Sequence, residues 1–316
     1  MTSKLYIASK PATLDSWDPQ HLYLVYDPDG VINSGDERII RGGPPSGTTG
    51  VSGFINIEVG VPITESEDGA KTIQTLPSAE SRNFTLLEEG NAATALWEAM
   101  ISFAISLSND DNAAPGAAYL TGFTYAPTNS NSNSTVTSVM AAAGLNVQSY
   151  LPVLGGDLDG DGIRDGSSPP ETSRVTFADV PGAHAFLSGG QGNTFVGGNG
   201  TNVFYDTADA DGDSGYDVFN GGNGKDYYYY IQPGPSQPLT WSAIRDGNGN
   251  VIGDRVQTPD GKHDDLFSVE NVANKTYDNT HKFMYQFNAG LMFNDVTETQ
   301  LASLNSDLDA VYEVTT

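Results

Sequence analysis

The chain contains no cysteine, which excludes disulfide bonds and thiolate metal sites but leaves its redox compartment open. Basic residues are also few, because 14 Lys and Arg stand against 40 Asp and Glu among 316 residues, for a formal net charge of −26. A chain of this charge is repelled by phosphate, so we expect no nucleic-acid partner. Clustered carboxylates bind divalent cations, and the free energy of that binding can stabilise the folded state.

Long hydrophobic runs are absent as well. No stretch reaches about 18 consecutive apolar residues, the length that a membrane-spanning helix needs, so we expect no transmembrane segment. The first residues, MTSKLYIASKPATLDSWDP, lack the basic start and the apolar run of a secretory signal peptide. Secretion would therefore need another signal.

Glycine and aspartate, in contrast, recur with a period of nine residues in the segment GYDVFNGGNGKDYY, which begins at Gly215. Glycine permits the positive φ angles of a tight turn, and Asp217 and Asp226 offer oxygen to a hard cation. The apolar residue two positions after each aspartate is expected to point into a core. One alternative is a hairpin loop rich in glycine and asparagine.

This segment resembles the glycine-rich nonapeptide of RTX (repeats-in-toxin) proteins. The resemblance covers roughly residues 189–272 and implies a short parallel β-roll that binds Ca²⁺. Upstream the pattern weakens, because Thr194 and Asn202 occupy the aspartate position, and we expect those turns to bind calcium poorly or not at all.

A second acidic loop begins at Asp157 and follows the D-x-D-x-D-G pattern, which places three carboxylates around one cation. It differs from an EF-hand, because Ser168 stands where a glutamate would close the coordination shell, and a thrombospondin- or dockerin-like loop is the better comparison. The alternative is a solvated acidic linker. A third acidic loop, at 209–213, directly precedes the nonapeptides. The predicted calcium ligands are Asp157, Asp159, Asp161, Asp165, Asp209, Asp211, Asp213, Asp217 and Asp226.

The RTX resemblance also implies a location. Proteins of this type are exported by type I secretion machinery that reads an uncleaved C-terminal segment, and the acidic tail 301–316 resembles such a segment. We therefore expect a secreted, extracellular protein. Inside a cell with little free calcium the repeats would stay disordered, and outside they would fold around the metal.

The first half of the chain has a mixed pattern of strands and helices. The run from His21 to Tyr26 and a second run from Arg38 are joined by turn residues and predict a β-hairpin, which 53–59 continues as a third strand. Residues 91–108 carry apolar side chains at helical spacing, and a polar loop then enters a second, amphipathic helix that stops at Gly144. We predict an α+β domain over 1–153, with an antiparallel sheet and helices, and a mostly β domain over 154–316.

The N-terminal half resembles the circularly permuted NlpC/P60 papain-like hydrolases and lecithin retinol acyltransferase relatives, in which a strand histidine precedes an Asn-Cys pair that opens a helix. Here Asn131-Ser132 occupies the place of that pair. The resemblance implies that His21 is the general base and Ser132 the nucleophile, at a helix end that favours developing negative charge. Serine in place of cysteine matters, because its hydroxyl stays protonated and depends on its base.

Two classes of function remain open on the sequence alone. The first is a secreted hydrolase or acyltransferase whose C-terminal half is ordered by calcium. The second is a non-catalytic extracellular protein of a surface layer, matrix or adhesion complex, in which calcium supports folding and self-association or contact with a cell surface. In that case Ser132 or Ser134 would only cap the helix. The tyrosines from Tyr227 to Tyr230 would suit the second class, since alternate members of a strand are expected to face outward.

Overall fold

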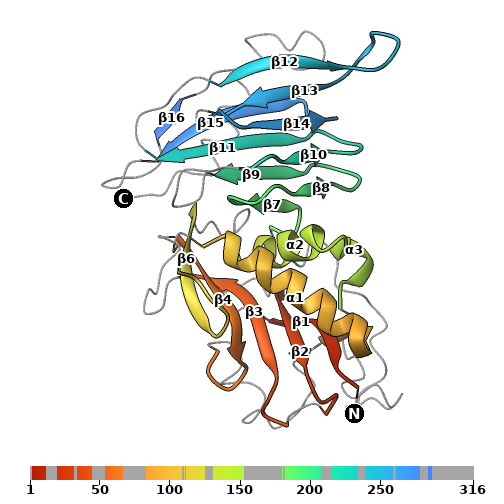
Figure 1. Cartoon of the computed structure of the whole chain (residues 1–316), viewed down its shortest axis with the longest axis vertical. Coiled ribbons are helices and arrows are strands. Elements are labelled where there is room, and N and C mark those ends of the chain that lie inside the picture. Colours follow the sequence, from red (N-terminus) through yellow and green to blue (C-terminus); the bar gives the residue numbers. More distant parts are fainter. Residues whose placement is uncertain are drawn as a thin grey trace.

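The computed structural model of the chain describes residues 2–11, 20–31, 34–44, 54–66, 83–108, 110, 112–124, 131–152, 180, 182–207, 215–233, 239–258, 261–277 and 284–286. These residues form three sheets and three helices. In Figure 1 the antiparallel sheet lies at one end of the molecule, the helices lie in the middle, and the remaining strands stack at the other end. No helix among the described residues is long and apolar enough to cross a membrane.

The N-terminal sheet has six strands in the order β5-β1-β2-β3-β4-β6, and every neighbouring pair is antiparallel. The predicted hairpin is confirmed as β2 and β3, and the predicted third strand as β4. Alternation of apolar and other residues explains the faces, since Leu22 and Leu24 point to the helices whereas Tyr23 and Val25 belong to a cluster on the opposite face. The strands are β1 (Lys4–Pro11), β2 (Gln20–Asp27), β3 (Arg38–Gly43), β4 (Phe54–Pro62), β5 (Asn83–Glu89) and β6 (Ala117–Thr124).

The first helix, α1 (Gly90–Ser106), covers the sheet with a buried stripe that includes Trp97, whose ring stacks on Tyr26 at a centroid distance of 5.3 Å. The second, α2 (Ser132–Ala142), is followed by Gly144 with φ +80°, which confirms the predicted glycine stop. Residues 132–140 are all buried, so α2 is enclosed rather than amphipathic. The short α3 (Val147–Tyr150) follows.

From β7 to β12, successive strands of the C-terminal half alternate between two sheets. β7, β9, β11 and β15 pair in parallel in one sheet, and β8, β10 and β14 in the other; the first sheet continues into β16, and the second into β13 and β12, by antiparallel pairing. The strands are β7 (Ala185–Ser188), β8 (Thr194–Val196), β9 (Val203–Thr207), β10 (Val218–Asn220), β11 (Tyr227–Pro233), β12 (Thr240–Arg245), β13 (Val251–Gln257), β14 (His263–Phe267), β15 (Asn271–Tyr277) and β16 (Met284–Gln286).

Aromatic rings fill the space between these two sheets. Phe204 of one sheet lies against Phe219 of the other, with ring centroids 5.2 Å apart, and Phe219 also contacts Phe195 and Tyr228. Phe219 and Tyr228 are the apolar residues predicted to point inward, and both are fully buried. This part of the prediction is confirmed.

The expectation that alternate tyrosines of this strand face outward is wrong. Tyr228, Tyr229 and Tyr230 are all buried, and only Tyr227 is partly exposed. Tyr228 belongs to the aromatic packing between the sheets, and Tyr229 stacks on Tyr205 of the neighbouring strand at 5.4 Å. The rings are therefore used for packing and do not form an exposed tyrosine surface.

Helix α2 joins the two halves. Its Thr137 hydroxyl donates to the Ala183 carbonyl at 3.0 Å, and its Ser138 hydroxyl accepts from the Leu187 amide at 2.6 Å. Leu187 lies in β7, at the edge of its sheet, so the bond from Ser138 occupies a position on an edge that could otherwise pair with another strand. One hydrophobic core runs from the antiparallel sheet through the helices into the parallel strands. The predicted boundary at 153/154 lies outside the described residues and stays a prediction.

Candidate functional site

The start of α2 is set by asparagine. The Asn131 side chain accepts from the amides of Asn133 at 2.8 Å and Ser134 at 3.3 Å, and the Ser134 hydroxyl accepts in return from the Asn131 amide at 2.8 Å. This reciprocal arrangement is a capping box. The sequence left open whether Ser132 or Ser134 caps the helix. The cap consists of Asn131 and Ser134, and Ser132 is not part of it.

The Ser132 hydroxyl instead lies beside a histidine. His21 Nδ1 and Ser132 Oγ are 2.6 Å apart, although 111 residues separate them in sequence. Both side chains are largely buried, with exposed fractions of 8% and 5%. The structure therefore brings together the two residues that the papain-like resemblance singled out.

Asn133 holds this geometry in place. Its Oδ1 accepts from the Leu22 amide at 2.7 Å, and its Nδ2 donates to the Gln20 carbonyl at 3.0 Å. These bonds join the Asn133 side chain, in the first turn of α2, to the main chain on both sides of His21. They hold His21 close to Ser132. Asn133 was missed in the sequence, where it looked like one more polar residue in an Asn/Ser-rich loop.

The pair can carry out one kind of chemistry well. A hydroxyl within hydrogen-bond distance of an imidazole nitrogen can lose its proton to that nitrogen as it attacks an electrophilic carbon. Ser132 is the first residue of α2, where the helix dipole favours developing negative charge.

A second group of functional side chains lies between the two parallel sheets. Asp206, Asp217 and Asp264 are fully buried, and each contributes one carboxylate oxygen to a group in which all oxygens lie within 4.8 Å of one another. We call these three residues the carboxylate cluster. They come from the end of β9, the residue before β10, and β14.

Several donors position the carboxylate cluster. Asp217 accepts from the Asn193 amide at 2.6 Å and the Ser188 hydroxyl at 2.9 Å, while its own amide donates to Asp264 at 3.0 Å. The Tyr228 hydroxyl donates to Asp264 Oδ2 at 2.5 Å. Asp206 receives fewer hydrogen bonds. The Tyr228 hydroxyl is 3.3 Å from its Oδ2, and its buried Oδ1 has no hydrogen-bond partner among the described residues.

The electrostatics of the carboxylate cluster are unfavourable for three free anions. Burial, and then the negative charges of Asp264 and Asp217, raise the pKa of Asp206 well above its ordinary value. Burial and the charge of Asp264 likewise raise the pKa of Asp217. Such a cluster is stable when it holds protons or a cation, and oxygen-only ligands are those that hard divalent ions prefer. The cluster can therefore hold a metal ion.

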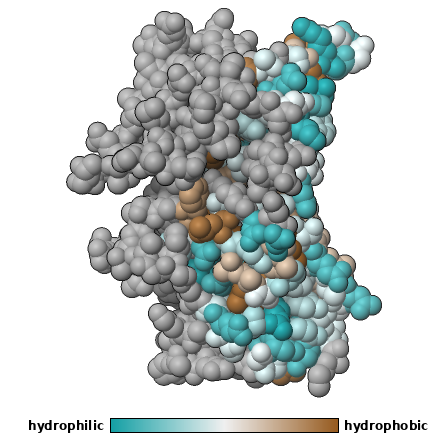
Figure 2. Space-filling model, turned by 60° about the vertical axis from the view of Figure 1, so that its left-hand side comes forward, coloured by the Kyte–Doolittle hydropathy of each residue, from teal (hydrophilic) through white to brown (hydrophobic). Residues whose placement is uncertain are grey.

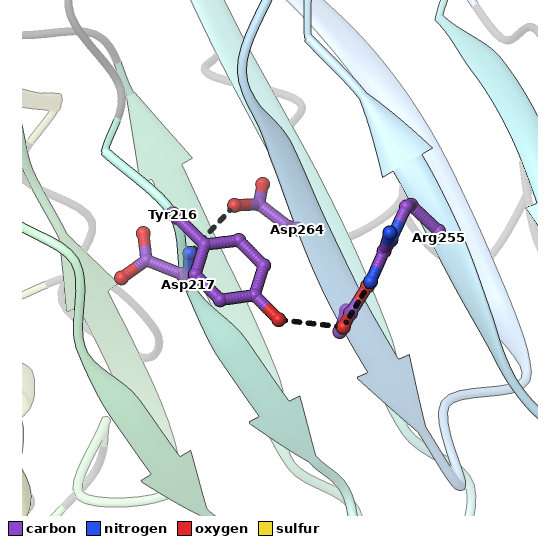
Figure 3. Close-up of polar contacts among 5 residues, drawn as sticks. Tyr216, Asp217, Arg255 and Asp264 are labelled. Atoms are coloured by element: carbon purple, nitrogen blue, oxygen red, sulfur yellow. Dashed lines mark hydrogen bonds and ion pairs between the residues drawn. The ribbon is translucent and has the colours of Figure 1, made fainter. Parts of the chain in front are cut away.

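One neighbouring carboxylate, that of Asp265, has a different environment (Figure 3). Asp265, next to Asp264, receives two hydrogen bonds from Arg255, at 2.7 and 2.8 Å, and one from the Tyr216 hydroxyl at 2.6 Å. Burial alone would raise the pKa of Asp265, but these bonds outweigh it and lower the pKa. Figure 3 shows Asp217 and Asp264 close together, whereas the Tyr216 hydroxyl is directed toward the carboxylate bound by Arg255.

Asp226, the second predicted nonapeptide ligand, does not belong to the carboxylate cluster. Its Oδ1 accepts from the amide of Asn202 at 2.7 Å and from Asn202 Nδ2 at 2.9 Å. The same Nδ2 lies 3.0 Å from the Gly221 carbonyl, 3.1 Å from that of Gly200 and 3.4 Å from that of Gly198. Four oxygens thus converge on one amide group, the Nδ2 of Asn202.

The other predicted ligands lie outside the described residues; they are Asp157, Asp159, Asp161, Asp165, Asp209, Asp211 and Asp213. Asp206 and Asp217 flank the last three of these in the sequence. Asp206 and Asp264 were missed as ligands, because Asp206 looks like one residue of an alternating strand and Asp264 belongs to a strand outside the repeat. A paired DD at 264–265 was the available signal.

No protein-family model, curated protein or solved structure matches this chain. Inference about its function therefore depends on the geometry of the two sites.

Proposed function

We propose that the N-terminal half is a hydrolase or acyltransferase domain in which Ser132 is the nucleophile and His21 the general base. The observation that carries the proposal is the 2.6 Å contact between His21 Nδ1 and Ser132 Oγ at the start of a helix. The order of the elements supports it, because a histidine on a strand of an antiparallel sheet precedes a helix with an Asn-Ser start, as in the papain-like proteins that the sequence resembles.

In the proposed reaction Ser132 Oγ attacks a carbonyl carbon of an ester, thioester or amide while its proton passes to His21 Nδ1. The tetrahedral carbon then expels its leaving group, which takes the proton from His21, and an acyl group remains on Oγ. Water completes hydrolysis by the reverse sequence, and an acceptor amine or hydroxyl completes acyl transfer. The amides of Asn133 and Ser134 already bind Asn131, so the helix dipole and the Ser132 amide are left to stabilise the oxyanion.

The absence of cysteine allows a direct test. Ser132→Cys introduces a single thiol into the chain, and its rate of alkylation by iodoacetamide can be followed from pH 5 to 10. If His21 acts on this position, the thiol should react as a thiolate well below its ordinary pKa of about 8.5. The matched control is Ser106→Cys, at the partly buried end of α1, where the hydroxyl donates to the Phe103 carbonyl.

The double variant His21→Gln, Ser132→Cys should move the alkylation profile back toward that of the control. A profile for Ser132→Cys that resembles the control from the start, or a thiol that no small reagent reaches, would contradict the proposal. A positive result would be followed by a screen of p-nitrophenyl esters and peptide amides, with Ser132→Ala as the inactive reference.

A second proposal concerns the C-terminal half, where the carboxylate cluster favours cation binding. We propose that this half is a short β-roll that Ca²⁺ orders outside the cell, after export by a type I system. Two observations support it: β7 to β11 alternate between two sheets by parallel pairing, and Asp206 Oδ1 has no hydrogen-bond partner among the described residues. If Ser132 is inert, the protein is then a calcium-folded structural or adhesion component. On the face in Figure 2 the coloured residues are mostly pale to teal, and brown residues gather near the middle.

The calcium proposal is tested by thermal unfolding of the whole chain in chelator and in about 10 mM calcium. Calcium at 100 times its dissociation constant should stabilise the folded state by about 2.7 kcal/mol. Asp206→Asn should lose the stabilisation that calcium bound at the carboxylate cluster provides. Asp246→Asn is the control, because Asp246 lies in a hairpin turn and its carboxylate accepts from Asn248 and Asn250. An Asp206 variant with a full response would refute the assignment.

A further inference from the structure

A second group of carboxylates lies in the antiparallel sheet, in the loop between β2 and β3. Asp27 ends β2, and Asp29 and Asp36 follow in the loop. Each contributes one carboxylate oxygen to a group in which all three oxygens lie within 4.8 Å of one another. The loop is at the opposite end of β2 from His21, the second residue of that strand, and it is remote in sequence from the calcium ligands predicted in the C-terminal half.

Hydrogen bonds fix the described residues of the loop. The Gly30 amide donates to Asp27 Oδ1 at 2.7 Å, and the Val31 amide donates to Asp29 Oδ1 at 2.7 Å. Gly30 has φ +75°, and a Cβ at this position would lie 2.2 Å from the Thr2 carbonyl oxygen. Glu37 accepts from the amides of residues 34 and 35, so a fourth carboxylate is used to fix the loop. The three aspartates are therefore held close together.

One oxygen of this group has no described partner. Asp27 is completely buried, its Oδ1 receives the Gly30 amide, and its Oδ2 has no hydrogen-bond partner among the described residues. A buried carboxylate oxygen that lost water without gaining a donor is costly. Burial, and then the carboxylates of Asp29 and Glu37, raise the pKa of Asp27 to about 6 despite the hydrogen bond from Gly30. Asp27 thus brings a buried carboxylate oxygen without a described donor to a group of three carboxylates.

We propose that Asp27, Asp29 and Asp36 form a binding site for a hard divalent cation, of which calcium is the best fit. Two oxygens that bind one calcium ion at 2.3–2.6 Å can be as far apart as about 5.2 Å, so each pair of oxygens in the group is close enough to share one ion. Calcium accepts irregular shells of six to eight oxygens, whereas magnesium needs a near-ideal octahedron. Bound there, the ion fixes the hairpin that carries His21 at its other end.

This site depends neither on the proposed catalysis nor on the proposed roll. It assigns calcium to the half of the protein in which the acidic nonapeptides are absent. The functional consequence is that a bound cation anchors the strand that carries His21.

The experiment is equilibrium dialysis of the full-length chain against radioactive calcium at about 1 mM and pH 7.5, which counts the bound ions. Asp27→Asn should bind one ion fewer per chain than the unsubstituted protein. Asp246→Asn, the same substitution in a hairpin turn with its own amide donors, should bind the same number. Asp206→Asn should lose a different ion, so failure of this site and failure of the carboxylate cluster are separable.

The local readout is the amide resonance of Gly30 in a ¹⁵N spectrum. It should shift as calcium is added to the unsubstituted protein and to Asp206→Asn, and it should not shift in Asp27→Asn. If Asp27→Asn does not fold, the partly exposed Asp36→Asn takes its place in both measurements. An unchanged ion count in these variants, or a Gly30 resonance that calcium does not move, overturns the proposal.

Discussion

Asn202 occupies a position where the repeat pattern calls for aspartate, and its replacement by aspartate should make the protein more dependent on calcium. In the structure Asn202 Nδ2 lies 2.9 Å from Asp226 Oδ1 and 3.0 Å from the Gly221 carbonyl. We infer that the amide group serves in place of an ion in this turn. Asn202→Asp removes the donor and places a second buried carboxylate against that of Asp226.

The expected size of the effect follows from these contacts. Asn202 is 5% exposed and Asp226 is fully buried, and a buried charge left without a partner costs about 3–5 kcal/mol. Without calcium, Asn202→Asp should therefore be less stable than the unsubstituted chain by about this amount. With calcium at 100 times its dissociation constant, about 2.7 kcal/mol should return. Asn202→Ala also loses the donor, at about 1–3 kcal/mol, but gains no ligand.

The assay is urea unfolding of the three proteins, monitored by tyrosine and tryptophan fluorescence, in chelator and in about 10 mM calcium at pH 7.5. The quantity to compare is the change in the unfolding midpoint that calcium produces in each protein. This change should be largest for Asn202→Asp, and it should be equal in Asn202→Ala and the unsubstituted chain. If Asn202→Asp responds to calcium no more than Asn202→Ala does, the amide does not stand in for a cation.

Two further predictions concern the carboxylate cluster and the contact between α2 and the sheet. Because the pKa values of Asp206 and Asp217 are raised in the folded state, the calcium-free protein should lose stability as the pH rises from about 4 through those values. The urea midpoint should therefore fall with pH across this range, and it should fall less steeply in Asp206→Asn. An equally steep fall in Asp206→Asn would contradict the assignment. Gly42→Ala should cost about 1–3 kcal/mol in thermal unfolding and reduce the reactivity of a Ser132→Cys thiol, because a Cβ there would lie 2.3 Å from Thr135 Oγ1. Gly247→Ala, in open space, should leave both measurements unchanged.

Much of the N-terminal architecture could be predicted from local patterns. The strand at His21–Tyr26, its partner beginning at Arg38 and the helix after Asn91 were all found near their observed bounds, because alternation, turn residues and helical spacing act over a few residues. The enclosed character of α2 was not visible. Its Ser and Thr side chains look like a solvated face in the sequence, yet they bond to Ala183 and Leu187, far along the chain.

The two residues of the candidate active site, His21 and Ser132, were predicted from a different kind of evidence. Nothing in the local sequence shows that His21 and Ser132 meet, and their pairing came from the order of elements in a resembling family. The structure adds the reason why the contact is short, which is that Asn133 binds the β2 backbone on either side of His21. A hydrogen bond between a side chain and a distant main chain leaves no pattern in a single sequence.

In the C-terminal half, local sequence patterns and strand register account for different features of the structure. Glycine and aspartate spacing determined where the turns fall and which aromatic residues point inward, because turn geometry and strand alternation are local properties. The register between stacked strands decided the rest, since it brings Asp217 and Asp264 together across 47 residues and places the Asn202 amide among four oxygens. Register depends on which strands become neighbours, and only the folded chain specifies that.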